Sequence, residues 1–311
     1  MNKITLNIPK RGSDNFLEPI YNFMNFVSIL NQNEVDILEI DFSKCKFANP
    51  FIIGGAASLA NSHNQKGGEK SKVITNSVNE EFSNYLDTIS FYDGFNYSEC
   101  NLDELDNALR SYYTKTYIPI VCFPTGKTEH EVKIREKIIT AINNIIKNQL
   151  GLKQEQFTAI AYLIDELTQN IVEHSGSEKG ILFAQFYPTK NYMDVCIVDY
   201  GKGLFQSYID SGKHHPKSEE EAINFAVFGK STKDLAESRG FGISTSREML
   251  VTGLKGKFFL YSGGTFYIQT LEQQEVLSLL DEYNYKGCYI ALRIPVIQQD
   301  DFNFYNFVEG K

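Results

Sequence analysis

The fold is decided by the stretch 154–203, QEQFTAIAYLIDELTQNIVEHSGSEKGILFAQFYPTKNYMDVCIVDYGKG. Its first part places apolar side chains at helical spacing, which predicts a helix from about Gln154 to His174. Two apolar runs follow around the turn PTKN, and their length and composition predict paired strands, ILFAQFY and YMDVCIVDY. A long amphipathic helix followed by two strands predicts helices packed on a sheet.

The same pattern extends in both directions. Upstream, YIPIVCF predicts a strand, and a helix is expected from about Glu131 to Leu150. Downstream, a long loop-and-helix region precedes three more predicted strands, KFFLY, TFYIQ and CYIALRIPV. Together these elements predict an α/β sandwich over residues 117–297, with a polar and aromatic tail at 298–311.

The opening third alternates in the same way. ITLNI, VDILEIDFS and SKVIT are predicted strands, and helices are expected over Phe16–Leu30, after NP at the small-residue segment FIIGGAAS, and from Asn79 to about Ile89. From about residue 98 to 115 the chain becomes polar and charged, which predicts a last helix and a domain boundary. Residues 1–112 are therefore expected to form a first domain.

The composition excludes several classes of protein. The chain has 311 residues, more than one core of about 150 residues needs, and 42% of them are hydrophobic, which excludes a disordered or collagen-like chain. A formal net charge of -9 disfavours non-specific nucleic-acid binding. The longest uncharged stretch holds too many polar groups to cross a membrane, and the scattered cysteines are typical of reduced thiols. The sequence predicts a cytoplasmic protein.

Two candidate motifs lie on the predicted helix and at the end of the second strand. Glu166, Asn170 and His174 follow i, i+4, i+8 spacing, so they form a stripe about a quarter-turn from the apolar face. Asp199 ends the strand in the motif DYGKG. A carboxylate fixed at a strand end can accept a hydrogen bond from an adenine amino group, and glycines let the backbone approach a ligand. Solvated polar residues and an ordinary turn are the alternatives.

The third motif is a glycine-rich segment, RGFGI, before the predicted helix STSREML. Free N–H groups at the start of a helix suit a phosphate chain, although a glycine turn that only caps the helix fits the same residues. The neighbouring GKST has Asn224 where a P-loop has its first glycine, so we reject a P-loop. Candidate nucleotide-binding residues in this region are Lys230, Lys233, Arg239, Gly240, Phe241, Gly242 and Ile243.

In the order E-x-x-x-N, D-x-G-x-G, G-x-G, these motifs resemble the GHKL, or Bergerat-type, nucleotide-binding domain of gyrase, the heat-shock 90 chaperone, histidine kinases and mismatch-repair ATPases. The resemblance covers Tyr117 to about Pro295. It implies a mixed sheet with helices on one face and a site for ATP and Mg²⁺. It further assigns Glu166 as general base, Asn170 as Mg²⁺ ligand, Asp199 to adenine, Gly201 and Gly203 to the pocket floor, Gly240 and Gly242 to the phosphates, and residues 204–239 to a lid.

Within that superfamily, NIVEHSGS is most similar to the anti-sigma-factor serine kinases, whose asparagine is often followed by a Glu-His pair, here Glu173 and His174. The acceptor helix of a histidine kinase is not visible, because His130 lies too close to Asn170 for a dimerisation hairpin. The chain departs from the superfamily at Cys288, where threonine commonly follows the glycine.

Roughly residues 35 to 95 resemble the sulphate-transporter and anti-sigma-antagonist (STAS) domain, which implies a βα sandwich. Antagonists of that family carry a phosphorylated serine just before the small-residue helix. Here that stretch reads Ala48-Asn49-Pro50 and has no hydroxyl, so a protein-binding role is expected in place of phosphorylation.

These resemblances predict a Mg-ATP-binding regulator that acts on a protein partner, in the manner of an anti-sigma-type serine/threonine kinase. One alternative is a switch without kinase activity, in which ATP binding or slow hydrolysis changes the partner that is held. Another is a scaffold that binds no nucleotide. The oligomeric state is left open, and a homodimer is among the alternatives.

Overall fold

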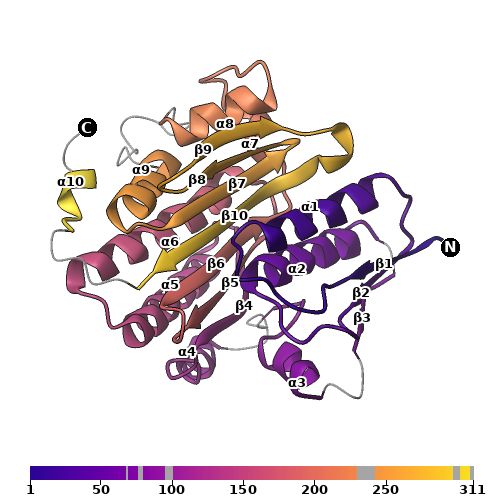
Figure 1. Ribbon diagram of the computed structural model, residues 1–311, viewed down its shortest axis with the longest axis horizontal. Coiled ribbons are helices and arrows are strands. Elements are labelled where there is room, and N and C mark those ends of the chain that lie inside the picture. Colours follow the sequence, from indigo (N-terminus) through magenta and orange to yellow (C-terminus); the bar gives the residue numbers. More distant parts are fainter. Residues whose placement is uncertain (68, 76–79, 95–100, 230–241, 297–301, 309–311) are drawn as a thin grey trace.

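Two β-sheets of different character organise the chain (Figure 1). The computed structural model describes residues 1–67, 69–75, 80–94, 101–229, 242–296 and 302–308. A three-stranded parallel sheet has the order β1-β2-β3, and a seven-stranded sheet has the order β4-β5-β6-β10-β7-β8-β9. The strands are β1 (Lys3–Asn7), β2 (Ile37–Asp41), β3 (Lys72–Ile74), β4 (Tyr117–Pro124), β5 (Lys179–Tyr187), β6 (Tyr192–Asp199), β7 (Lys257–Gly263), β8 (Thr265–Gln269), β9 (Gln274–Ser278) and β10 (Tyr285–Pro295).

The expected α/β character is confirmed, and the expected mixed sheet is wrong. Every strand pair of the seven-stranded sheet is antiparallel. The connections explain three of these pairs, because short hairpins join β5 to β6, β7 to β8 and β8 to β9, and a hairpin reverses the chain. The sequence analysis also omitted β9, whose residues are mostly exposed at the edge of the sheet and lack the apolar alternation of a half-buried strand.

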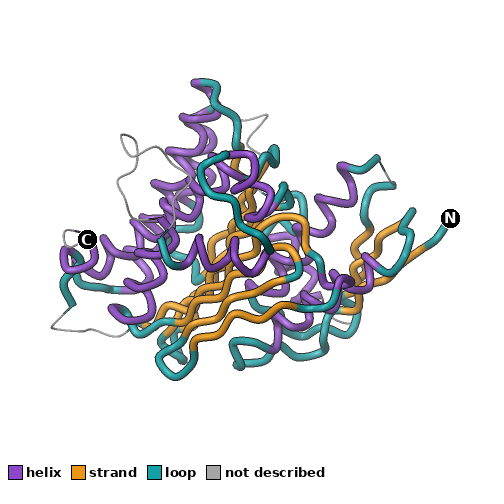
Figure 2. Tube along the Cα trace, turned by 90° about the horizontal axis from the view of Figure 1, so that it is seen from above, coloured by secondary structure: helices purple, strands orange, loops and turns teal. Residues whose placement is uncertain are grey.

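Helices lie on both faces of the seven-stranded sheet, and those of the second predicted domain share one face, as expected. The helices α5 and α6 cover one face, while α1 and α2 lie between the other face and the small sheet, as Figures 1 and 2 show. The helices are α1 (Glu18–Asn31), α2 (Pro50–Gln65), α3 (Glu80–Thr88), α4 (Leu102–Arg110), α5 (Glu129–Leu150), α6 (Gln154–His174), α7 (Gly203–Ser211), α8 (Glu219–Val227), α9 (Gly242–Glu248) and α10 (Tyr305–Val308), with a π-helix at Met249–Gly253 and a 3₁₀ turn at Asp281–Tyr283.

Strand β6 shows that the large sheet contributes side chains to two hydrophobic cores, one on each face. Its successive side chains point to opposite faces, and both sets are apolar. Val195 and Ile197 join the core under α5 and α6, whereas Cys196 and Val198 join the core that α1 and α2 complete. A continuous apolar run in the sequence is therefore the signature of a strand covered on both sides.

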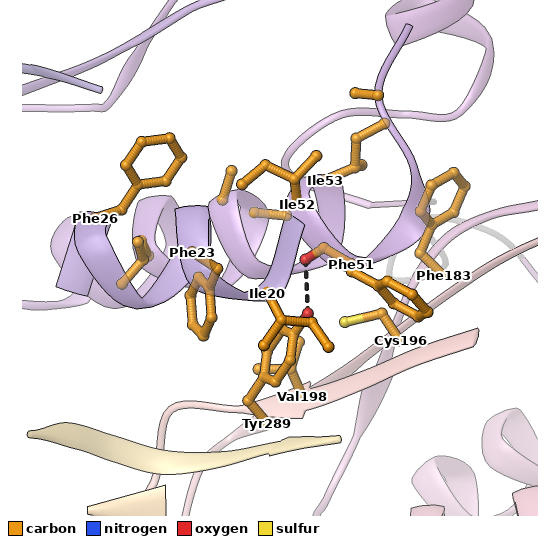
Figure 3. Close-up of a cluster of buried hydrophobic side chains, with 14 of the residues drawn as sticks. Ile20, Phe23, Phe26, Phe51, Ile52, Ile53, Phe183, Cys196, Val198 and Tyr289 are labelled. Atoms are coloured by element: carbon orange, nitrogen blue, oxygen red, sulfur yellow. Dashed lines mark hydrogen bonds between the residues drawn. The ribbon is translucent and has the colours of Figure 1, made fainter. Parts of the chain in front are cut away.

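Helix α2 is buried on all sides at its N-terminal half, where every residue from Pro50 to Ala60 is buried; Figure 3 shows Phe51, Ile52 and Ile53 of this part. Its small residues make this possible. A side-chain carbon on Gly54 would lie 2.7 Å from the sulfur of Cys196, and one on Gly55 would lie 2.4 Å from the ring of Phe23. The two glycines thus let α2 approach both the sheet and α1, which a larger residue would prevent.

A buried ion pair also joins the N-terminal segment to the large sheet. Arg293 on β10 donates two hydrogen bonds to the carboxylate of Asp194 on β6, at 2.7 and 2.8 Å, and a third to the backbone oxygen of Asp14 at 2.7 Å. Its guanidinium lies 4.0 Å from the ring centroid of Tyr192. Burial raises the pKa of Asp194 to about 6 even though Arg293 opposes the shift, so the pair is ionised at neutral pH.

The segment around the predicted domain boundary contacts the second half of the chain. Helix α4 begins at a capping box formed by Asn101 and Glu104, and its Leu105 and Leu109 join the core under α5 and α6. The limits at residues 112 and 117 stay a prediction. Among the described helices, none has both the length and the apolar character needed to cross a membrane.

Candidate functional site

The polar stripe on α6 lies beside the first residue of α9. The opposite face of α6 is anchored in the core by Ile160, Leu163, Leu167 and others, which leaves Glu166 and Asn170 half-buried at the margin. A side-chain carbon on Gly242 would lie 3.9 Å from Oε1 of Glu166. The structure therefore brings together one residue from the first predicted motif and one from the third.

Asn170 carries a buried polar group that the described part of the chain does not satisfy. Its Nδ2 is inaccessible to solvent and has no hydrogen-bond partner among the described residues. A buried amide group without a partner costs about 1–3 kcal/mol, so such groups in native proteins usually have a ligand or water to bind. The third residue of the stripe, His174, lies in the last turn of α6 with Nε2 3.5 Å from the carboxylate of Glu173.

Asp199 is the last residue of β6, and its side chain is almost completely buried, with 1% of the residue exposed. Its Oδ1 accepts a hydrogen bond of 2.8 Å from the backbone N–H of Gly201. Burial raises the pKa of Asp199 to about 7, and hydrogen bonds from the backbone of Gly201 and Cys288 oppose the rise. A strongly shifted, buried carboxylate at the end of a strand is a candidate for function.

Glycines let three chain segments meet around this carboxylate. A side-chain carbon on Gly201 would lie 2.0 Å from the backbone oxygen of Ser175, directly after α6, and that oxygen accepts a hydrogen bond of 2.8 Å from the N–H of Lys202. On the other side, a side-chain carbon on Gly287 would lie 2.2 Å from the backbone oxygen of Asp199. Only glycine fits at both positions, so the ends of α6 and β6 and the start of β10 are in direct backbone contact.

Ser262 closes the same cluster from β7. Its hydroxyl donates to the backbone oxygen of Gly287 at 2.8 Å and accepts from the N–H of Leu204 at 2.9 Å, next to Gly203. The sulfur of Cys288 lies 3.7 Å from the same hydroxyl. Ser262 was not identified from the sequence, where SGG reads as a turn, and only its pairing with β10 reveals its position.

The remaining predicted residues divide into two groups. Gly242 and Ile243 are described, and Ile243 is partly buried against the core under α6 and against the small cluster around Tyr208 on α7. The other predicted phosphate contacts fall outside the described residues: Lys230, Lys233, Arg239, Gly240 and Phe241. Most of the predicted lid is described, and it contains α7 and α8.

The described residues fit a magnesium ion that is shared with phosphate groups. They contain no cluster of three or more His, Cys, Asp or Glu side chains able to hold a metal on their own. Mg²⁺ commonly keeps several waters and is held by one or two protein oxygens together with substrate phosphates. The amide oxygen of the half-buried Asn170 is a ligand of the kind that Mg²⁺ prefers, and its nitrogen, unpaired among the described residues, is a donor that a phosphate oxygen would satisfy.

Comparisons of the chain with protein-family models, with curated proteins and with solved structures give no match. The functional interpretation therefore depends on the residues and geometry above.

Proposed function

We propose that this chain is a Mg-ATP-binding regulatory protein. The observation that carries the proposal is the buried carboxylate of Asp199, held between backbone segments at the end of β6. Two backbone amides are its hydrogen-bond donors, and within the described part of the chain no cationic side chain contributes to its pKa. A carboxylate in this setting destabilises the fold unless a ligand uses it, and an exocyclic amino group of adenine supplies the missing donor.

For the reaction, we propose an anti-sigma-type serine/threonine protein kinase. Glu166 would accept the proton of a serine or threonine hydroxyl, and Asn170 would hold Mg²⁺ one helical turn further along α6. When bound, Mg²⁺ neutralises charge on the phosphates. A side-chain carbon on Gly242 would lie 3.9 Å from Oε1 of Glu166, so the start of α9 faces the proposed base.

The second candidate is an ATP-dependent switch without phosphoryl transfer. It is favoured by the contact between the N-terminal helices and the strands that carry the site. Near the C-terminal end of α2, Gln65 donates a hydrogen bond of 3.4 Å to the hydroxyl of Tyr200, the residue after Asp199. A change at the site could therefore be transmitted to the N-terminal surface, which the STAS resemblance assigns to protein binding.

The test combines ATP binding with transfer of label from γ-labelled ATP. We expect the wild type to bind Mg-ATP and Asp199→Asn to bind it about 5- to 100-fold more weakly, since an amide donor then faces the adenine amino group. Label on a protein supports the kinase, and free phosphate or simple retention supports the switch. Asp194→Asn is the matched control, because it alters a second buried aspartate on β6 that lies far along the strand from the site.

Absence of ATP binding by the folded wild type would overturn the proposed function in both forms. Equal ATP affinities of the wild type and Asp199→Asn would overturn the role of Asp199 alone.

A further inference from the structure

Tyr285, the first residue of β10, links the N-terminal helices to the backbone of Asp199. Its hydroxyl donates a hydrogen bond of 2.6 Å to the backbone oxygen of Asp199. The same hydroxyl lies 2.6 Å from Oγ of Ser58 on α2. Ser58, Tyr285 and Asp199 are all buried, so water does not compete for these hydrogen bonds.

The chemistry of the three groups fixes the direction of the two hydrogen bonds. A backbone oxygen can only accept, and a tyrosine hydroxyl has one proton to donate. Tyr285 uses that proton on Asp199, so Ser58 must donate to Tyr285. Burial also raises the pKa of Tyr285 well above its ordinary value, so the phenol keeps its proton at physiological pH. The result is a directed chain of hydrogen bonds from α2 to Asp199.

Two further contacts hold this chain in place. The ring of Phe23 on α1 meets the ring of Tyr285 edge-on, with centroids 5.3 Å apart. Gln65 lies seven residues after Ser58 and hence on the same face of α2, where it reaches Tyr200. The N-terminal helices are therefore linked to Asp199 through Tyr285 and to Tyr200 through Gln65, although these residues are far apart in the sequence.

We propose that Ser58 and Tyr285 are positioning residues of the nucleotide site, so that the hydrogen bonds from Ser58 through Tyr285 to Asp199 set the affinity for adenine nucleotides. This inference rests on the proposed function. The backbone oxygen of Asp199 belongs to the peptide group that precedes Tyr200 and Gly201, and the Gly201 N–H is the donor to the Asp199 carboxylate. Fixing that peptide orients the carboxylate. By linkage, a bound nucleotide must in turn strengthen the hydrogen bonds from Ser58 through Tyr285 to Asp199.

The same strand provides a matched control. Tyr289 lies four residues after Tyr285 on the same face of β10, is equally buried, and stacks on Phe23 with centroids 4.4 Å apart. Its hydroxyl donates to the backbone oxygen of Phe51 at 2.9 Å, drawn as a dashed line in Figure 3. Tyr289→Phe therefore removes one hydrogen bond between α2 and the sheet without touching Asp199, whereas Tyr285→Phe removes the bond to Asp199.

The experiment compares Tyr285→Phe, Ser58→Ala and Tyr289→Phe in the full chain. Titration calorimetry with Mg-ADP gives affinities, and urea unfolding shows how far each variant is destabilised. We expect Tyr285→Phe to weaken ADP binding about 5- to 10-fold and Ser58→Ala about 2- to 5-fold, with Tyr289→Phe within about 2-fold of the wild type. Hydrogen exchange without nucleotide should be faster in the Asp199–Gly201 segment for the first two variants only.

The inference is overturned if the folded Tyr285→Phe and Ser58→Ala proteins bind ADP as the wild type does, or if Tyr289→Phe weakens binding as much as they do. Should Tyr285→Phe fail to fold, Ser58→Ala carries the test alone. If the wild type binds no adenine nucleotide, the proposed function fails and the affinity claim falls with it. Hydrogen exchange then still decides whether Ser58 and Tyr285 position Asp199.

Discussion

Replacement of Asp199 by asparagine should stabilise the protein while it damages the site. The change removes a charge and keeps the shape, and the amide oxygen can still accept the hydrogen bond from Gly201. The pKa of Asp199 rises from 3.8 to about 7 on folding, so ionised Asp199 costs the folded state on the order of 4 kcal/mol above pH 7. The new amide donor is itself buried without a partner, at about 1–3 kcal/mol. We therefore expect a net gain of about 2 kcal/mol at pH 8.

The pH dependence of this gain follows from the direction of the shift. A carboxyl whose pKa is higher in the folded state contributes its full stability below about pH 4, and the contribution falls as the pH rises to about 7. The advantage of Asp199→Asn should accordingly shrink from pH 7 downward, vanish at about pH 5 and reverse below it, where only the cost of the unpaired amide donor is left. Urea unfolding followed by far-UV circular dichroism is the assay, since the chain has no tryptophan.

A variant that is less stable than the wild type at pH 8, or a stability difference that does not change with pH, would refute this reasoning. Asp194→Asn is the comparison, because it weakens the buried pair with Arg293 and should destabilise the fold at neutral pH. If Asp199→Asn gains stability and loses ATP affinity, and Asp194→Asn does neither, Asp199 is a residue that is retained for function at a cost in stability.

Four other changes test the site and the packing. Glu166→Gln should leave ATP affinity within about 2-fold and lower phosphoryl transfer on the order of 100-fold in a label-transfer assay, because it removes only the base. Asn170→Ala should impair both, and calorimetry should show that Mg²⁺ no longer strengthens ATP binding. Gly55→Ala should cost roughly 1–3 kcal/mol in urea unfolding, because the added carbon would lie 2.4 Å from a buried ring. Arg293→Met should cost about 3–5 kcal/mol, because it leaves the carboxylate of Asp194 buried without its partner.

Each of these has a result that would contradict it. Normal transfer by Glu166→Gln excludes it as the base, and an unchanged Mg²⁺ effect in Asn170→Ala excludes a metal ligand there. Wild-type stability of Gly55→Ala would show that the interface between α1 and α2 relaxes more readily than the distance implies, and wild-type stability of Arg293→Met would show the same for the surroundings of Asp194.

Local sequence patterns were sufficient to predict helices whose ends and apolar faces are set by residues close together in the chain. The predicted bounds of α6 are confirmed, because the apolar spacing runs unbroken from Ile160 to Ile171. Helix α5 begins at Glu129, two residues before the predicted start, because the side chain of Thr128 caps it through a reciprocal bond with Glu131. The burial of α2 on all sides was not predictable, since small residues indicate close packing without revealing what lies on each side.

In the candidate site, too, the positions set by local spacing were predictable and the long-range contacts were not. The positions of Asp199 at the end of β6 and of Glu166 and Asn170 on one margin of α6 followed from spacing, and the structure confirms them. Tyr285 was not identified, because nothing near it in the sequence indicates that its hydroxyl meets Ser58, a residue 227 positions away. The roles of these residues toward ATP stay predictions.

The position of β10 imposes an order on folding during synthesis. It is the last strand of the large sheet to be made, yet it lies in the middle of that sheet, and it is the strand on which Phe23 packs. At ribosomal rates of about 5–20 residues per second, α1 and α2 wait on the order of tens of seconds for it. During that time Phe23 lacks Tyr285 and Tyr289, the two rings at β10 against which it packs. The first third of the nascent chain is therefore the part that most needs a chaperone, and it completes its core only after nearly all of the sequence has left the ribosome.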